Sequence, residues 1–395
     1  MPVQTIANAP GHVDWIGWFF SDSLLRLFVI RDAPSFWGSN ISMKDGFPYN
    51  LFELAASKCH DLQQVEMPSC DPILSRRSGS ADSRMTLVSQ LSCLWTALRV
   101  VSGTESLLDP QNLEALGQLP RLDTLKINAQ YGESSSIAAG EIKWPEQCFP
   151  SIRHLHLIAI RFDTLEALWN FTSLVHPLIT LEVETGVQDR AAALCSSTRS
   201  RTVKFIRELS SRSPNIINLD CRLHACRFFC NACAPARLSS SELTCLEALP
   251  LQTLSFRRIC LAENVYHSHL AGAIPQVRTL QLLDAHLTLE DLYHYVTCLP
   301  RLEYIGCTLA DPRLEMKGAL IEHSTVESAL RAHHAINFDL KLPQPASPES
   351  PLHDDQISFL ARYLRQLCPL ARCSSIDGEF EHVCRKINKI LLKHR

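Results

Sequence analysis

The sequence predicts an irregular α/β solenoid, in which short parallel strands form a sheet on the concave face and helices cover the convex face. Three observations predict it. The chain has 395 residues, and a single hydrophobic core stops growing at roughly 250–300 residues, so several domains or a repeat array are required. A short apolar phrase recurs along the chain, and helix signals lie between its copies. Strand, loop and helix repeated with one handedness give a parallel sheet on one side and helices on the other.

The recurring phrase reads apolar-x-x-apolar-x-apolar and usually follows a proline by one or two residues. Its last two apolar positions are two residues apart, so both point to one face of a short strand. The proline ends the preceding helix because it lacks an N–H and fixes φ. The clearest copies begin at Leu122, Ile152, Leu178, Ile216, Leu251, Val277 and Leu302, and weaker copies read Leu24-Leu27-Val29, Leu62-Val65-Met67 and Trp95-Leu98-Val100.

The distances between the clear copies identify the type of repeat. Successive copies begin 30, 26, 38, 35, 26 and 25 residues apart. Leucine-rich repeats have periods of about 20–29 residues. Four of the six steps fall in or next to that window, and the two long steps require insertions. The predicted architecture is therefore a leucine-rich-repeat-like solenoid, or horseshoe.

Helix signals lie between the phrases. Asp109 is a suitable N-cap because Pro110 follows it at the first helical turn. Thr288 and Asp291 resemble a capping box. Strict alternation of apolar residues predicts one more strand at 336–342. Further helix starts are expected at Asp163, Thr202, Ser324 and Asp354.

These patterns divide the chain into four parts. An N-terminal remnant or cap (1–23) precedes the main array (24–310), and irregular C-terminal repeats follow (311–376). The third part (311–376) includes a loop at 343–351, which carries four prolines in nine residues and is expected to be exposed. An amphipathic helix ends the chain (377–395). We interpret this helix as a cap, because a repeat array must cover its open end; a partner-binding helix is the alternative.

The composition argues against several classes of protein. Lys and Arg total 38 and Asp and Glu total 41, a net charge of −3, whereas dedicated nucleic-acid binders carry a clear basic excess. No run of about 18 apolar residues occurs, so no membrane span is expected. The sixteen cysteines are spread along the chain, whereas disulfide scaffolds are short and cysteine-dense. We therefore expect reduced thiols and a cytoplasmic or nuclear protein without a secretory leader.

The proline-led phrases, the long insertions and the final short strand, Pro369-x-x-Arg372-Cys373, resemble the leucine-rich-repeat region of basidiomycete fungal F-box-like proteins over roughly residues 20–376. The resemblance implies that the repeats select the substrate of a ubiquitin ligase. It also implies an upstream F-box that docks the chain on a Skp-type adaptor. The stretch before Leu24 is too short for an F-box, so we expect that domain to be missing here.

A cluster of four cysteines and one histidine is the sharpest candidate for a metal site. Cys221, Cys226, Cys230 and Cys233 have the spacing Cys-x4-Cys-x3-Cys-x2-Cys, and His224 lies among them. Structural zinc takes four such ligands, but strong sites show two Cys-x2-Cys knuckles and this cluster has one. Cys221 also occupies an inward strand position. We therefore expect buried structural thiols and no cofactor, with the other four residues as weak zinc candidates.

The expected working surface follows from the geometry of the strands. Residues that flank the second apolar position of each phrase should point out of the core, onto the concave sheet, where repeat arrays bind partners. The candidate contacts are Lys126, Asn128, His154, His156, Glu182, Glu184, Asp220, Arg222, Arg257 and Gln281.

Three functions stay open for this surface. Phosphate loops, dinucleotide glycine motifs and standard hydrolase signatures do not occur in the sequence, so we predict a non-catalytic protein. It would bind a protein partner, either as the substrate-selecting part of an F-box-type ligase or as a stand-alone scaffold without a link to ubiquitin. The third interpretation, a zinc-stabilised binding protein or an enzyme, depends on the cysteine cluster alone.

Overall fold

The computed structural model describes residues 27–29, 62–66, 95–129, 148–185, 192–223, 236–262, 265–310, 334–341, 353–375 and 381–393. The chain divides into two compact units, Met1–Gln188 and Asp189–Arg395, and each is described by itself. None of the helices in the described ranges is both long enough and apolar enough to cross a membrane.

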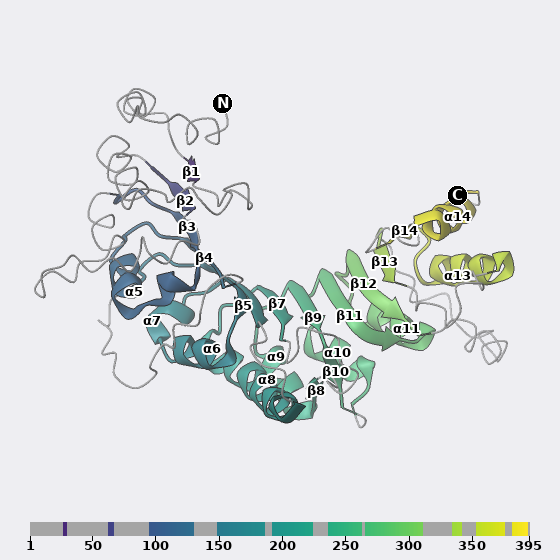
Figure 1. Ribbon diagram of the computed structural model, residues 1–395. Helices are drawn as coiled ribbons and strands as arrows, with labels where there is room; N and C mark the ends of the chain where they lie inside the picture. The colour runs from purple at the N-terminus through teal and green to yellow at the C-terminus, as the bar shows by residue number, and fades with distance from the viewer. Residues whose placement is uncertain are drawn as a thin grey trace, which may run out of the picture. The chain divides into compact units, whose positions relative to one another are not determined.

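The first unit is a parallel sheet whose strands pair in chain order. Its described strands are β1 (Leu27–Val29), β2 (Gln64–Glu66), β3 (Val100–Gly103), β4 (Thr124–Asn128), β5 (His154–Ile160) and β6 (Thr180–Thr185). The connections form the helical segments η2 (Glu105–Leu108), α5 (Pro110–Gly117), α6 (Phe162–Trp169) and α7 (Thr172–Val175). The helices α5, α6 and α7 lie on one side of this sheet (Figure 1).

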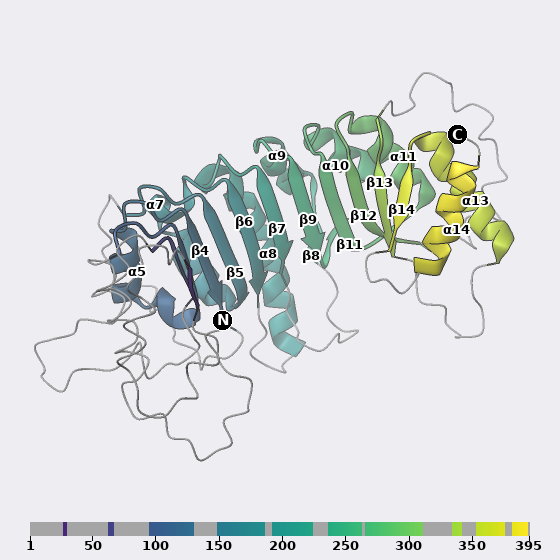
Figure 2. The ribbon, with the colours of Figure 1, turned by 90° about the horizontal axis from the view of Figure 1, so that it is seen from above.

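The second unit repeats the same arrangement. Its sheet contains β7 (Asn218–Arg222), β9 (Thr253–Arg257), β11 (Thr279–Leu287), β12 (Tyr304–Leu309), β13 (Asn337–Lys341) and β14 (Arg372–Ser374), all parallel. A separate parallel pair consists of β8 (Ala236–Leu238) and β10 (Ile259–Leu261). The helices are α8 (Ala192–Arg212), α9 (Ser240–Glu247), α10 (His267–Ala273), α11 (Leu289–Cys298), α13 (Asp354–Leu367) and α14 (Glu381–Leu392). Figure 2 looks onto the strands, with α9, α10 and α11 behind them.

The core lies between the strands and the helices, and the repeat phrase builds it. In β4, Leu125 and Ile127 are buried while Lys126 and Asn128 are exposed. The two inward positions of the later strands are at most 2% exposed, and full burial of one such side chain stabilises the fold by about 1.5–3 kcal/mol relative to exposure. This confirms the predicted α/β leucine-rich-repeat-like architecture. The inward pairs are Leu155/Leu157, Leu181/Val183, Leu219/Cys221, Leu254/Phe256, Leu280/Leu282, Ile305/Cys307 and Phe338/Leu340.

Two of the weak copies have a different register from the predicted one. In β3, Val101 lies opposite Leu125, so the phrase begins three residues later than Trp95. In β1, Phe28 lies opposite Val65, which shifts that copy by one residue from Leu24. Both stretches offer apolar residues at competing positions, so the phrase alone leaves the register open and the pairing with the neighbouring strand decides it.

Several predicted element boundaries are confirmed. The Asp109 side chain accepts a hydrogen bond from the Gln111 amide at 3.0 Å and caps α5. In α11, the Thr288 amide donates to the Asp291 carboxylate at 2.8 Å, and the Asp291 amide donates to the Thr288 hydroxyl at 3.1 Å. The strand expected at 336–342 is β13, and α13 begins at Asp354 as predicted.

Two other helix starts were predicted wrongly. The N-cap of α6 is Arg161, and Asp163 lies in the first turn, where a carboxylate still favours the helix dipole. Thr202 lies in the middle of α8 and is 1% exposed. It resembled a cap in the sequence because the apolar residues of the buried face follow it. Ser324 lies outside the described residues.

Gly117 and Gly272 offer a matched test of how closely the helices pack. A Cβ added to Gly117, at the end of α5, would lie 2.9 Å from Cys148 Cβ, whereas nothing lies within 4 Å of one added to Gly272 in α10. We expect Gly117→Ala to lower the free energy of unfolding by about 1–3 kcal/mol through overpacking. Gly272→Ala should raise it by about 0.5–1 kcal/mol, because alanine favours a helix over glycine. Urea denaturation followed by circular dichroism measures both, and equal effects would contradict the close packing at Gly117.

Candidate functional site

The outward side chains of each sheet form rows that cross the strands, because parallel pairing places equivalent positions side by side. We call the outward side of the strands in each unit its sheet face. On the first unit, one row contains Thr124, His154 and Thr180, and the next contains Lys126, His156 and Glu182. On the second unit, the first row contains Asn218, Thr253, Thr279, Tyr304, Asn337 and Arg372. The second row contains Asp220, Ser255, Gln281, Gly306, Asp339 and Ser374.

All ten residues predicted as candidate contacts lie on these two faces. Lys126 and Asn128 are exposed, and the other eight are partly buried. Six of the ten belong to the first unit and four to the second.

The two histidines of β5 each face a carboxylate on the first unit. His156 Nδ1 lies 2.8 Å from Glu182 Oε2, and both side chains are less than a quarter exposed. His154 Nε2 lies 3.7 Å from Asp123 Oδ2. Asp123 precedes its strand by one residue and does not belong to the apolar phrase, so its contact with His154 could not be predicted from that phrase. Glu182 on β6 thus holds the His156 ring in a defined position.

Hydrogen bonds within the second sheet face also fix its side chains. Arg222 donates from Nη2 and Nε to the two carboxylate oxygens of Asp220, at 2.7 and 3.3 Å. The Ser255 hydroxyl donates to Gln281 Oε1 at 3.3 Å, one strand away. These contacts fix the orientation of the polar side chains. The buried inward residues of the same strands hold the backbone in place.

Tyr304 and Asp339 form a further pair on this face that the sequence analysis missed. The Tyr304 hydroxyl donates to Asp339 Oδ2 at 2.6 Å, and burial together with this hydrogen bond raises the tyrosine pKa well above its ordinary value. A Cβ added to Gly306 would lie 3.2 Å from the Tyr304 ring, so the ring extends along its own strand over the glycine. The flanking rule would have found Tyr304 had it been applied to the copy that begins at Leu302.

The cysteine cluster is described only in part. Cys221 is fully buried at an inward position of β7, and burial raises the pKa of its thiol well above the ordinary value. A protonated buried thiol suits packing, since zinc binds the thiolate. Cys226, Cys230, Cys233 and His224 lie outside the described residues. Within the described ranges, the structure brings no three metal-ligating side chains together.

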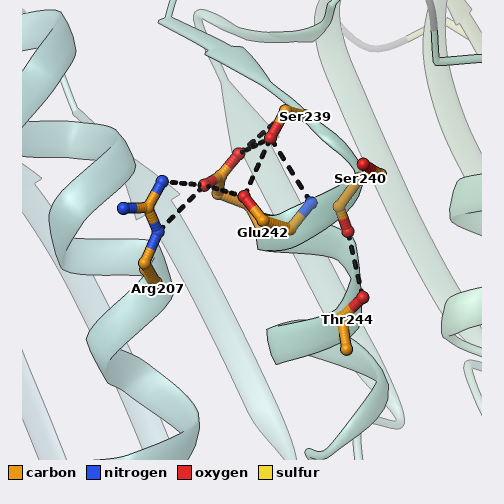
Figure 3. A network of polar contacts seen from close by, with 6 residues as sticks. Arg207, Ser239, Ser240, Glu242 and Thr244 are labelled. Atoms are coloured by element: carbon orange, nitrogen blue, oxygen red, sulfur yellow. Dashed lines mark hydrogen bonds and ion pairs between the residues drawn. The ribbon is translucent and has the colours of Figure 1, made fainter.

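A dense polar cluster lies on the helical side of the second unit, where Glu242 joins α8 to α9 (Figure 3). Glu242 is 1% exposed, and its Oε1 accepts from Arg207 Nη2 at 2.6 Å and from the Ser241 hydroxyl at 2.8 Å. Its Oε2 accepts from the amide and the hydroxyl of Ser239, at 2.7 and 2.6 Å. Ser239 and Glu242 therefore form a capping box that Arg207 clamps to the neighbouring helix.

The electrostatics of Glu242 indicate a structural role. Burial by itself raises its pKa, but the hydrogen bonds from Ser239, Arg207 and Ser241 outweigh burial and lower it from 4.5 to about 2. A carboxylate held in this way stays ionised at neutral pH and does not exchange protons with a substrate. The cluster stabilises the contact between two helices.

Comparison with known proteins does not assign the chain to a family. No protein-family model and no curated protein matches the sequence. Similar solved structures include yeast Rad7 in its complex with Elc1 (14% identity, 80% of this chain and 69% of that chain, TM-score 0.36). The leucine-rich-repeat-containing protein LegL7 from Legionella pneumophila has 14% identity, covering 93% and 98% of the two chains with a TM-score of 0.40. TLR13, in its complex with ssRNA13, has 13% identity, covering 80% of this chain and 33% of that chain, with a TM-score of 0.30.

Proposed function

We propose that this protein is a non-catalytic recognition protein whose sheet faces bind a protein partner. The observation that supports this is the arrangement of polar side chains in continuous rows on the outward side of both sheets. Lateral contacts such as His156–Glu182 hold these side chains in place before any partner arrives. Side chains that are already ordered lose less conformational freedom on binding, so such a surface binds at a lower entropic cost.

A finer proposal concerns the pathway in which the protein acts. We propose that it selects substrates for an F-box-type ubiquitin ligase in the cytoplasm or nucleus, and that a Skp-type adaptor joins it if an F-box is supplied. The support is the resemblance of its repeat phrases to basidiomycete fungal F-box-like proteins. The alternative is a stand-alone interaction scaffold with no link to ubiquitin.

Affinity capture of the full chain from its native cell extract, followed by mass spectrometry, distinguishes these two proposals. Recovery of a Skp-type adaptor together with a cullin would support the ligase. Recovery of other proteins without them would mean that the repeats bind partners while this chain has no link to ubiquitin, as the scaffold proposal expects.

The position of the binding surface can be tested with charge changes on opposite sides of the same units. We expect Lys126→Glu and Gln281→Glu to reduce recovery of the captured partner without lowering the melting temperature, because both side chains lie on a sheet face. Glu114→Lys in α5 and Glu247→Lys in α9 are the matched controls, since both residues are exposed on the helical side. If the controls lose the partner and the sheet variants keep it, the proposed surface is wrong.

A further inference from the structure

Two arginines lie side by side where the first two strands of the second unit end. Arg222 is the last residue of β7 and Arg257 the last of β9, and the parallel register pairs them directly. Adjacent strands lie about 4.7–4.9 Å apart, so the two side chains start from neighbouring points on the same sheet face. Arginine stays charged at any physiological pH, so this corner carries two positive charges.

The two arginines differ in the hydrogen-bond acceptors around their guanidinium groups. Asp220 binds Arg222 through both carboxylate oxygens, which offsets one of the two charges. Arg257 is partly buried, and its Nε is buried without a hydrogen-bond acceptor among the residues that the structure describes. A buried donor without an acceptor is costly, and a donor on a charged group more so. Among the residues that the structure describes, Arg222 thus has a carboxylate partner and the Arg257 guanidinium has none.

We infer that Arg257, with Arg222 beside it, is the anchor for a side-chain carboxylate in an acidic, extended peptide segment of the protein partner. This inference rests on the proposed function and names the chemistry of the partner. A carboxylate offers two oxygens in a plane, which matches the paired N–H groups of a guanidinium. It would offset the positive charge of Arg257 and reduce the repulsion between the two arginines.

The rest of the face favours a peptide over a nucleic acid. The row beside the arginines contains Asp220, Ser255 and Gln281, and the row beyond it contains Asn218, Thr253 and Thr279, which are uncharged groups able to hydrogen-bond to a peptide backbone. Asp220 and Asp339 lie in the row beside the arginines, where a peptide can place uncharged residues, whereas RNA or DNA carries a phosphate at every nucleotide and would be repelled there.

Fluorescence anisotropy with labelled decaglutamate, at roughly 0.15 M salt to screen long-range attraction, tests the inference on the full chain. We expect the wild-type protein to bind decaglutamate and not decaglutamine. Arg257→Gln should weaken binding roughly tenfold, the loss expected for hydrogen bonds to a charged group. Arg257→Lys should recover only part of the affinity, because lysine keeps the charge but loses the planar fork. Arg362→Gln is the matched control, since Arg362 is exposed on α13.

A charge reversal separates a specific anchor from a general loss of structure. Arg257→Glu should abolish binding of decaglutamate and create binding of decalysine at an unchanged melting temperature. The inference is overturned if decaglutamate does not bind, if Arg257→Gln and Arg362→Gln weaken it equally, or if single-stranded RNA binds more tightly than decaglutamate. Each of these results would leave the test of the sheet faces with Lys126→Glu unaffected, so the two proposals fail separately.

Discussion

Replacing Glu242 by glutamine is expected to lower the free energy of unfolding by about 3 kcal/mol at neutral pH, because folding lowers the pKa of this carboxyl from 4.5 to about 2. The amide has the same shape but carries no charge, and it places an N–H group against donors from Ser239 or Arg207. Glu247→Gln on the same helix is the control, since Glu247 is exposed. Urea denaturation of the two variants and the wild type measures the difference.

The pH dependence of this effect provides a second, independent check. A carboxyl whose pKa is lower in the folded state stabilises the protein above its unfolded pKa and loses that contribution as protons bind. The contribution of Glu242 is therefore complete above about pH 5 and is lost as the pH falls from 4.5 towards 2. The difference in stability between wild type and Glu242→Gln should shrink between pH 5 and pH 3. A difference that stays constant over this range would show that the charge of Glu242 is not its source.

The Glu242 cluster also shows which parts of such a structure local sequence can predict. The spacing of Ser239 and Glu242 is that of a capping box, so the start of α9 could have been found from the sequence. The clamp by Arg207 could not, because 35 residues separate it from Glu242 and no local pattern connects them. Only the packing of α8 against α9 brings the two side chains together.

The same distinction applies to the strands and to the sheet faces. The apolar phrase predicted the inward positions of β4, β5 and the later strands because their side chains alternate with a period of two. It misplaced β3, where Trp95, Leu98 and Val101 are apolar at equal intervals and all are buried. Outward orientation was likewise predictable, but the individual pairs were not. The contact between Tyr304 and Asp339 depends on the register between strands that an insertion separates.

Asn388 in α14 gives the other large expected effect, because it completes the hydrogen bonding of the last described strand. Its Oδ1 accepts from the Cys373 amide at 2.9 Å, and its Nδ2 donates to the Cys373 carbonyl at 2.7 Å. The side-chain amide thus pairs with β14 as the backbone of a further strand would, on the edge opposite β13. An open strand edge invites pairing with another chain, and this contact closes it.

We expect Asn388→Leu to lower the free energy of unfolding by about 2–4 kcal/mol, since two partly buried backbone groups lose their partners together. Asn388→Asp keeps the acceptor for the Cys373 amide but places a carboxylate oxygen against the Cys373 carbonyl, so it should also lower the free energy of unfolding. Lys389→Gln, at the exposed neighbouring position, is the control. Hydrogen exchange at the Cys373 amide should accelerate in the leucine variant. If Asn388→Leu leaves both stability and exchange unchanged, α14 does not act as a cap, and its amphipathic face would favour the alternative interpretation as a helix that binds a partner.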